Sequence, residues 1–457
     1  MECRTTWLRM CQCSESFGTE IRAALAASDI QIEAEFRVPY GIVCFEKADE
    51  PLFAVLHEVR RDPHLRVLAV AASSLAVETG MIWRLLHAGA SDVLFWSGNG
   101  GEAAQLAAKL QRWFEVDELV EQAISQVALI GDSPAWNAVI RKVIEAARFS
   151  TIPVLLTGES GTGKELLAKL ISVVCASPGG TNKFRKELIT VDCGSLVPEL
   201  SGSEFFGHER GAFTGAHIQR EGAFAMADGA TLLLDEIGEV PLGLQAQLLR
   251  AIQEKTYKRV GGNVWQTTNF RLVCATNRDL EAAVHRGQFR LDLYYRIAGC
   301  VVRTPALKDR KEDILPLARY FLSDCLSGKD SEFDSTVSEY LLNHAYNGNV
   351  RELRQLIQRI AHRHAGPGPI TAGDVPEDDR PSAGETQVLW PDEEFERSIS
   401  NALANGACLK AIIRTAAETA IRIAVRAEGS NLKKAASKLG ITDRALQMRR
   451  ASGRLHG

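Results

Sequence analysis

The sequence of 457 residues lacks any apolar run of the roughly 18 residues that a membrane-spanning helix needs. Its first residues, Met1-Glu2-Cys3-Arg4, do not begin a secretion signal. Ten cysteines are scattered along the chain without CxxC pairs or metal-ligand spacing. These absences argue against a membrane protein, a disulfide scaffold and a zinc site, and they predict a soluble cytoplasmic protein with reduced thiols.

An excess of charge of one sign is lacking as well. Lys and Arg number 53 against 57 Asp and Glu, which gives a formal net charge of −4. The chain is therefore not basic throughout, and any contact with nucleic acid must be local. The hydrophobic content of 46% is ample for several cores, and the length suggests about three domains.

Residues 1–115 alternate short apolar runs with helical patterns, which predicts a doubly wound parallel sheet covered by helices on both faces. The expected strands are Trp7–Cys11, Ile30–Phe36, Gly41–Phe45, Arg66–Ala71 and Asp92–Trp96. The expected helices are Phe17–Ala27, Leu52–Arg61, Ala76–Ala88 and Glu102–Phe114. A regulatory domain, a structural cap and a dimerisation module are all compatible with such a fold.

A glycine-rich turn lies between an expected strand at 152–156 and an expected helix at 165–174. Strand, turn and helix in this order build a phosphate cradle from backbone N–H groups and a helix N-terminus, with Lys164 reaching the outer phosphates. Glu165 stands where Ser or Thr usually holds Mg²⁺. The alternative is a chance turn before an amphipathic helix. The predicted ATP-binding residues are Gly158, Glu159, Ser160, Gly161, Thr162, Gly163, Lys164 and Glu165.

A second expected strand, at 231–234, ends in two carboxylates, Asp235 and Glu236. Asp235 is expected to hold Mg²⁺ through water, and Glu236 to polarise the water that attacks the γ-phosphate, because phosphoryl transfer is mostly positioning and charge neutralisation. Alone, this segment could be a strand that runs into an acidic turn. Together with the glycine-rich turn it predicts an ATPase.

Between these two elements lies a loop of small residues around one aromatic: Gly211, Ala212, Phe213, Thr214, Gly215 and Ala216. An exposed apolar tip on such a loop usually contacts a partner, although Phe213 could instead fold back into the core. Here the chain resembles the AAA+ activators of sigma-54 RNA polymerase, the bacterial enhancer-binding proteins, from about Ile130 to Ile370. The resemblance implies that this loop grips the sigma factor, with Phe213 and Thr214 at the contact positions.

The resemblance also assigns roles beside the carboxylates. Asn277 matches the polar sensor that orients the attacking water. Asp192 stands where the family usually has an Asn that tethers the catalytic Glu. Two carboxylates at Asp192 and Glu236 would repel each other unless one is protonated or the pair is bridged, which bears on the timing of hydrolysis.

Three arginines complete the implied catalytic set. Arg290 and Arg296 match fingers that reach the ATP of a neighbouring subunit, whereas from residue type alone they could be surface ion-pair partners. Arg351 matches the lid sensor of the γ-phosphate, or is an ordinary arginine at a helix start. Asn349 is expected to be the N-cap of that helix. The lid helices are expected at Ile314–Leu326, Thr336–Ala345 and Asn349–Arg363.

The first domain resembles the receiver domain of two-component response regulators, but its catalytic positions differ. Cys11, Gln12 and Cys13 replace the acidic residues after strand one, Glu46 replaces the phosphoacceptor Asp, and Ala71 and Trp96 replace a hydroxyl residue and a Lys. Without a metal site, phosphoryl transfer lacks electrostatic support. We therefore predict a receiver-like domain that does not accept phosphate and is controlled by protein contact or not at all.

The carboxyl-terminal segment, 416–457, is basic. It has nine Lys and Arg against three acids, so 9 − 3 gives +6. Its pattern of a long helix and two short ones separated by Gly429-Ser430 and Gly440 resembles a Fis-type helix-turn-helix, although a basic helical tail is the alternative. The expected DNA-binding residues are Lys433, Lys434, Arg444, Gln447, Arg449 and Arg450.

The expected fold class is multidomain α/β plus α. The expected parts are a receiver-like sheet (1–115), a linker helix (116–129), an AAA+ P-loop α/β domain (130–306), its helical lid (307–370), a linker (371–415) and an all-α helix-turn-helix (416–457). The expected function is an ATP- and Mg²⁺-dependent ring, a dimer to hexamer, that binds upstream double-stranded DNA and remodels sigma-54 RNA polymerase. The alternatives are a DNA-binding repressor with a nucleotide-gated assembly switch, and an AAA+ protease partner or helicase loader.

Overall fold

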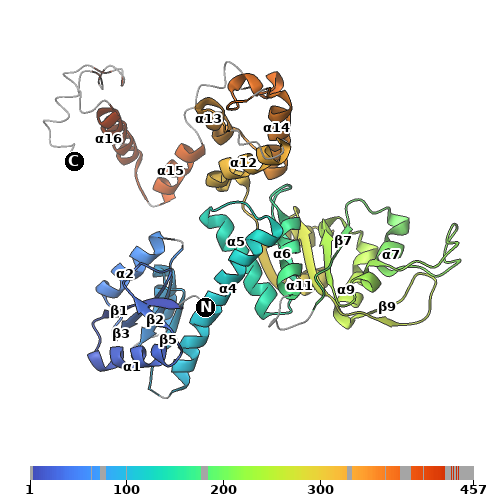
Figure 1. Cartoon of the computed structure of the whole chain (residues 1–457), viewed down its shortest axis with the longest axis horizontal. Helices are drawn as coiled ribbons and strands as arrows, with labels where there is room; N and C mark the ends of the chain where they lie inside the picture. Colours follow the sequence, from blue (N-terminus) through green and yellow to red (C-terminus); the bar gives the residue numbers. More distant parts are fainter. Residues whose placement is uncertain are drawn as a thin grey trace. The chain divides into compact units, whose positions relative to one another are not determined.

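The computed structural model (Figure 1) describes residues 4–62, 64–72, 79–98, 100–176, 184–326, 332–365, 367–380, 393–404 and 406–427, together with Lys434, Ala436, Leu439 and Ile441. The chain divides into two compact units, Met1–Pro376 and Glu377–Gly457. In the described part of the chain, no helix has the length and apolar character needed to cross a bilayer.

The first sheet has five parallel strands in the order β2-β1-β3-β4-β5. Its strands are β1 (Thr5–Cys11), β2 (Gln31–Glu33), β3 (Tyr40–Phe45), β4 (Arg66–Ala71) and β5 (Asp92–Phe95). Helices α1 (Glu15–Ala26) and α4 (Gly101–Val127) cover one face, and α2 (Glu50–Arg61) and α3 (Thr79–Ala88) cover the other (Figure 1). The predicted doubly wound sheet is confirmed.

Helix α4 differs from the prediction. Two helical segments, 102–114 and the linker helix at 116–129, were expected, and the structure joins them into one helix of 27 residues that ends at Val127. The sequence within α4 contains no Pro and no Gly after its first residue, so nothing interrupts its hydrogen-bond ladder. Leu106 and Leu110 pack in the first domain, whereas Val116 and Val120 pack against the next one. One helix therefore serves both domains.

The second sheet is also parallel, in the order β12-β6-β11-β8-β7. Its strands are β6 (Val154–Thr157), β7 (Leu188–Asp192), β8 (Thr231–Asp235), β11 (Arg271–Thr276) and β12 (Cys300–Arg303). Because the strands are parallel, their carboxyl ends meet at one edge, where ligands bind in such sheets. The predicted strands at 152–156 and 231–234 both lie in this sheet, as β6 and β8.

Helices cover both faces of the second sheet. On one face lie α5 (Pro134–Phe149) and α6 (Lys164–Ala176). On the other lie α7 (Pro198–Phe206), α8 (Ala223–Met226), α9 (Leu242–Glu254), α10 (Leu280–His285) and α11 (Leu291–Ile297). A short antiparallel hairpin, β9 (Thr256–Tyr257) with β10 (Gln266–Thr267), follows α9. Phe224 of α8 packs against Tyr257 and Phe270, so the hairpin is fixed to the core of this domain.

The predicted lid helices are confirmed as α12 (Ile314–Cys325), α13 (Ser335–Asn343) and α14 (Asn349–Arg363), which share one apolar core. In the second unit, α15 (Glu393–Ala404) lies within the segment expected to be a linker, and α16 (Leu409–Ala427) is the expected long helix. Ile421 and Ala424 of α16 pack with Ala436. Apart from Lys434, Ala436, Leu439 and Ile441, the predicted helix-turn-helix beyond α16 lies outside the described residues.

Candidate ATP site and partner loop

The turn between β6 and α6 has a backbone that only glycine accommodates. Gly158, Gly161 and Gly163 have φ values of 148°, 75° and 105°. A Cβ on Gly158 would lie 2.1 Å from Thr304 Oγ1, and one on Gly161 would lie 2.3 Å from the Gly348 carbonyl oxygen. The turn is therefore shaped by close backbone approach as well as by φ, as a phosphate cradle requires.

Lys164 begins α6 and is buried. Its ammonium donates to the carbonyl oxygens of Gly158 at 2.9 Å and Glu159 at 3.1 Å. Burial lowers the pKa of Lys164, and the nearby carboxylates of Glu236 and Asp235 oppose that shift. The ammonium thus lies across the mouth of the turn, where a phosphate oxygen can replace a carbonyl as its acceptor. Glu165 is exposed.

The predicted carboxylates meet at the carboxyl edge of the sheet. Asp235 ends β8, and its Oδ1 accepts a hydrogen bond from the Glu236 backbone N–H at 3.0 Å. Glu236 has a left-handed backbone with φ of 49°, and its Oε2 accepts from the Asn277 backbone N–H at 3.2 Å. Three neighbouring parallel strands, β6, β11 and β8, therefore bring the glycine turn, Asn277 and both carboxylates together.

Asp192 ends β7 and pairs in register with Asp235. Its Oδ1 accepts from the Gly194 backbone N–H at 2.9 Å. A Cβ on Gly194 would lie 3.3 Å from this oxygen and 3.8 Å from the Glu236 Cβ, so Asp192 and Glu236 flank Gly194. Within the described chain no hydrogen bond joins the two carboxylates. Asp192 instead closes its own turn, and the amide tether usual in the family has no counterpart among these hydrogen bonds.

The lid contacts the glycine turn through α14. Arg351 Nη1 donates to Ser160 Oγ at 3.0 Å, and the Val350 backbone N–H donates to the Gly161 carbonyl at 3.0 Å. Asn349 is fully buried, and its Nδ2 donates to Glu159 Oε2 at 2.9 Å and to the Ser160 carbonyl at 3.1 Å. The lid is thus hydrogen-bonded directly to the predicted phosphate site.

The N-cap prediction for Asn349 was wrong. Gly348 occupies that position, and Asn349 takes a left-handed backbone with φ of 53° as the first residue of α14. Its Oδ1 accepts from the Leu307 backbone N–H at 2.7 Å, so its side chain bridges two segments instead of capping its own helix. The local signal is that Asn is among the few residues that tolerate a left-handed backbone.

A second set of buried contacts between segments, around Arg310 and Asp313, was not predicted from the sequence. Arg310 donates to the Thr162 carbonyl at 2.9 Å, and its guanidinium lies 4.2 Å from the ring centre of Trp136. Burial lowers the pKa of Arg310 to about 10. Asp313 beside it accepts from both the backbone N–H and the hydroxyl of Ser133. These groups join the entry to the domain, the glycine turn and the start of the lid.

The two predicted finger arginines lie away from the glycine turn of their own chain. Arg290 forms a two-pronged ion pair with Asp292, with hydrogen bonds of 3.0 and 2.7 Å, which raises the pKa of Arg290 and lowers the pKa of Asp292. Arg296 lies exposed on α11. Among the described residues, no hydrogen bond or ion pair links either arginine to residues 158–165. Arg296 is therefore accessible to an acceptor outside the chain, whereas Arg290 would first have to leave Asp292.

The 211–216 loop is a tight turn. The Gly211 N–H donates to the Ala216 carbonyl at 2.8 Å, and Ala216 N–H donates to the Phe213 carbonyl at 3.0 Å. Gly211 and Gly215 have φ of 81° and 103°. Phe213 is 37% exposed, and its ring packs edge-on against His208 at 5.0 Å. The predicted exposure of Phe213 is confirmed, and the ring does not fold back into the core.

The corresponding edge of the first sheet is different. Glu46 Oε1 accepts from the Ser14 backbone N–H at 2.8 Å, and Trp96 Nε1 donates to Glu20 at 2.8 Å. Burial raises the pKa of Cys11 and of Cys13. Within the described ranges, no group of three His, Cys, Asp or Glu side chains is arranged to hold a metal ion.

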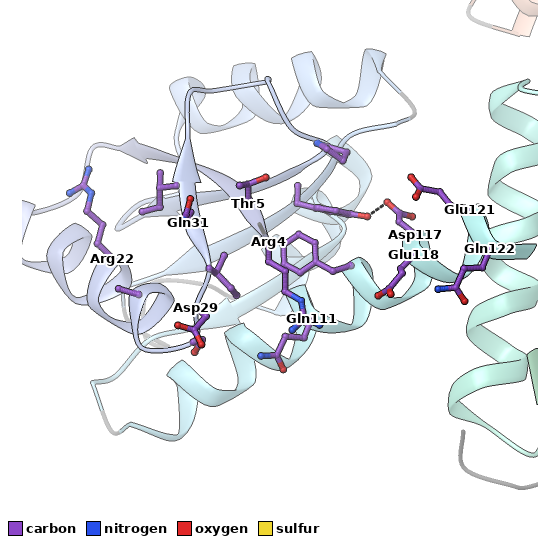
Figure 2. Close-up of a pocket in the computed structure, with 17 residues that line it drawn as sticks. Arg4, Thr5, Arg22, Asp29, Gln31, Gln111, Asp117, Glu118, Glu121 and Gln122 are labelled. Carbon is purple, nitrogen blue, oxygen red and sulfur yellow. Dashed lines mark hydrogen bonds between the residues drawn. The ribbon is translucent and has the colours of Figure 1, made fainter. Parts of the chain in front are cut away.

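A pocket of about 1450 Å³ lies at the opposite edge of the first sheet, where the strands begin (Figure 2). The Tyr40 hydroxyl from β3 donates to Asp117 of α4, and Asp117 forms an ion pair with Arg141 of α5 at 3.2 Å. Burial raises the pKa of Asp117. The pocket therefore lies between the first domain and α4, and none of the predicted catalytic residues lines it.

Of the predicted DNA-binding residues, only Lys434 is described; it lies in a helical segment and is exposed. Lys433, Arg444, Gln447, Arg449 and Arg450 lie outside the described residues.

Comparisons with known proteins match the same region. A family model described as the Sigma-54 interaction domain matches residues 129–303, and one described as an AAA+ ATPase lid domain matches residues 308–389. The transcriptional regulatory protein ZraR of Klebsiella oxytoca is 37% identical over 340 residues, covering 72% of this chain and 69% of that protein. ZraR of Escherichia coli is 35% identical over 407 residues, covering 86% and 84%. The alginate biosynthesis transcriptional regulatory protein AlgB of Pseudomonas aeruginosa is 38% identical over 361 residues, covering 76% and 78%.

Proposed function

Because this chain belongs to the family of sigma-54-dependent transcriptional activators, with an AAA+ ATPase at its centre, we propose that it assembles into a six-membered ring at upstream DNA and remodels the closed complex of sigma-54 RNA polymerase. The observation that carries the proposal is the hydrogen-bonded 211–216 loop in the same domain as the ATP site. Hydrolysis at the sheet edge is expected to move this loop against the sigma factor.

The hydrolytic chemistry follows from the groups at the carboxyl edge. Residues 158–164 would hold the phosphates through backbone N–H groups and the Lys164 ammonium, and Asp235 would hold Mg²⁺ through water. When bound, Mg²⁺ neutralises charge on the phosphate oxygens. Glu236 accepts hydrogen bonds from the attacking water and polarises it, and Asn277 orients that water.

Asp192 sets the position of Glu236 in this scheme. Repulsion across Gly194 disfavours a Glu236 rotamer that turns toward Asp192 and favours the one that meets the Asn277 backbone. Here Asp192 acts by repulsion where the family usually has an amide tether.

Arg351 couples the nucleotide to the lid, because it lies in the first turn of α14 and donates a hydrogen bond to Ser160 of the glycine turn. Arg290 and Arg296 act on the ATP of the next subunit, which is consistent with their exposure in the single chain. Charge from such a finger typically raises the rate by about 10³–10⁵. Catalysis then requires assembly.

The carboxyl-terminal residues 416–457 are proposed to bind double-stranded DNA in the cytoplasm as a Fis-type helix-turn-helix. The charge of this segment and the packing of α16 against Ala436 support the proposal. Lys433 and Lys434 would contact phosphates, and Arg444, Gln447, Arg449 and Arg450 would lie on the recognition helix. The affinity should then fall steeply with salt.

The decisive experiment uses the full chain with a sigma-54 promoter in vitro. Phe213→Ala should keep phosphate release within about twofold of wild type and lose transcription, because the loop contacts the partner and not the nucleotide. Ile218→Ala is the matched control, since Ile218 is 74% exposed just beyond the loop, and it should transcribe normally. Normal transcription by Phe213→Ala would overturn the assignment of the loop.

A further inference from the structure

The pocket at the edge of the first sheet where the strands begin is large and has a fixed wall. Its volume of about 1450 Å³ exceeds the roughly 300–1,000 Å³ typical of small-molecule sites. Tyr40 of β3 lines it, and the Tyr40 ring packs edge-on against Phe114 of α4 at 5.0 Å and stacks on Trp113 at 5.7 Å. Because these ring contacts hold the wall in place, little side-chain freedom would be lost when a ligand enters.

Part of the lining is apolar. Ile30 and Tyr40 are buried, Pro39 and Phe114 are half-buried, and Ile32 of β2 is 40% exposed. Apolar walls with a small number of charged groups are the usual composition of a ligand site, in which the apolar part supplies area and the charges fix the orientation.

The free charges of the lining are separated by sign. Figure 2 shows Arg22 of α1 at one end of the pocket and Glu118 and Glu121 of α4 at the other, with Arg4 between them. All four side chains are exposed. Within the part of the chain that the structure describes, none of them forms an ion pair or a side-chain hydrogen bond. Both signs of charge are therefore available to a ligand.

The two other acids of the lining do not change this separation. Asp117 of α4 is already held by the Tyr40 hydroxyl and by Arg141. Asp29 follows α1 and lies on the side of Arg22 (Figure 2). The side of α1 and the sheet thus has two cations and one acid, and the side of α4 has two free acids.

This arrangement selects the class of ligand. A ligand with charge of one sign would be attracted at one end of the pocket and repelled at the other, whereas a zwitterion meets both ends. The pocket wall also includes Gln31 and Ile32 of β2, which is an edge strand, and the structure describes no strand on its outer side. An extended peptide can add its backbone hydrogen bonds to such an edge.

We infer that this pocket binds a short peptide with free ends, with its carboxylate at Arg4 and Arg22 and its ammonium at Glu118 and Glu121. The inference does not depend on the proposed function, because the pocket contains no residue of the ATP site or of the 211–216 loop. The peptide lies against α4, which packs in both the first domain and the ATPase domain. The pocket is thus a place where the first domain receives a signal other than phosphate.

The test is saturation-transfer NMR on the full chain with an equimolar mixture of tripeptides that have alanine at both ends and valine, leucine, methionine, phenylalanine or tyrosine between them. At least one tripeptide should bind with a Kd at or below about 1 mM. Free phenylalanine should bind more weakly, because it cannot span the two ends. No transfer to any tripeptide, or equal binding of free phenylalanine, would overturn the inference.

Blocked ends and charge variants then locate the ligand. Acetylation of the amino end of the best tripeptide should weaken binding about fivefold, the upper range for exposed ion pairs. The double variant Glu118→Gln with Glu121→Gln should weaken binding of the free tripeptide equally and leave the acetylated one unchanged, because both changes remove the same contact. Amidation of the carboxyl end should pair in the same way with Arg4→Gln and Arg22→Gln.

Glu15→Gln and Arg37→Gln are the matched controls, because both side chains are exposed in the first domain and neither lines the pocket. Both variants should bind the free tripeptide as wild type does. Additive effects of acetylation and of the glutamate substitutions would place the ammonium elsewhere. Equal losses in the controls would show attraction by overall charge. Either result would overturn the inference.

Discussion

The two sheets of this chain are both parallel and five-stranded, with different strand orders, and they carry different residues at their carboxyl edges. In the second sheet that edge carries a glycine turn with the Lys164 ammonium on its carbonyls, and two carboxylates, Asp235 and Glu236, that accept backbone hydrogen bonds. In the first sheet it carries two cysteines and Glu46, whose carboxylate is occupied by the Ser14 backbone. Parallel strands supply a place for chemistry, and the residues after each strand decide whether any occurs there.

The two sheets also differ in where they contact the rest of the chain. The lid lies on the second edge through Asn349 and Arg351. The first sheet is instead connected at its opposite end, where Tyr40 meets Asp117 of α4 (Figure 2). We therefore expect substitutions at the carboxyl edge to affect catalysis only in the second sheet.

The largest contrast is expected from Lys164→Ala and Glu46→Ala. Lys164→Ala should reduce phosphate release by about 10² or more, because it removes the ammonium that lies on the Gly158 and Glu159 carbonyls at the mouth of the turn. Glu46→Ala should leave phosphate release unchanged. Steady-state assays with Mg-ATP measure both, and a fluorescent nucleotide reports binding. More than a tenth of wild-type activity in Lys164→Ala would mean that another cation holds the phosphates.

Arg296→Ala should lower phosphate release by about 10³, the lower end of the range for a finger. Its ATP site remains whole, since no bond joins Arg296 to residues 158–165 in the described chain. Mixing Arg296→Ala with Lys164→Ala should restore activity, because each variant supplies what the other lacks. A mixture of Arg296→Ala with Arg290→Ala, assayed in the same way, separates a role that the two arginines share from a role that each has alone. Failure of every mixture to recover would show that the fingers act within one chain.

Asn349→Gly should raise the KM for ATP about tenfold with a smaller change in kcat. Glycine keeps the left-handed backbone at this position, while the bonds from the side chain to Glu159 and Ser160 are lost. A hydrogen bond to a charged group contributes about 1.5–3 kcal/mol. Asn343→Ala, at an exposed lid position on α13, is the control and should behave as wild type. An unchanged KM would show that the lid bridge does not bear on nucleotide affinity.

The smallest effect is expected in the first domain. Incubation of the full chain with radiolabelled acetyl phosphate and Mg²⁺ should give no stable label, because Glu46 is a poor acceptor and no acidic cluster holds a metal among the described residues. A receiver domain with an intact aspartate serves as the positive control. Label that disappears in Glu46→Ala would contradict the prediction and make the two edges more alike than the geometry suggests.

Much of the fold and of the ATP site could be predicted from the sequence, because the patterns that indicate them are local. The glycine turn, the strand that ends in Asp235 and the alternation of 1–115 depend on residues within a few positions of each other. The lid bridge of Asn349 was not predicted, because its partners lie about 190 residues earlier in the chain. Its identity as an N-cap was inferred from residue type, and the fully buried, left-handed geometry overrode that preference.

The stacking of Arg310 on Trp136 was missed for a related reason. A buried arginine is rare, and its place is decided by a carbonyl of the glycine turn and by an aromatic ring from another helix. Likewise, the half-exposed position of Phe213 depends on His208, whose ring is fixed by Ser203 at 2.6 Å. The positions of such side chains depend on residues that are distant in the sequence, so the local sequence pattern does not predict them.

Helix α4 runs without interruption for 27 residues, which is about 40 Å at the standard rise. An unbroken helix of this length has no flexible position at which a rotation of one end could be absorbed. Its phase is counted in amino acids, so one inserted residue near its middle would turn Leu110 by about 100° relative to Val120. The number of residues between the two domains along α4 therefore fixes a rotation about the helix axis as well as a distance.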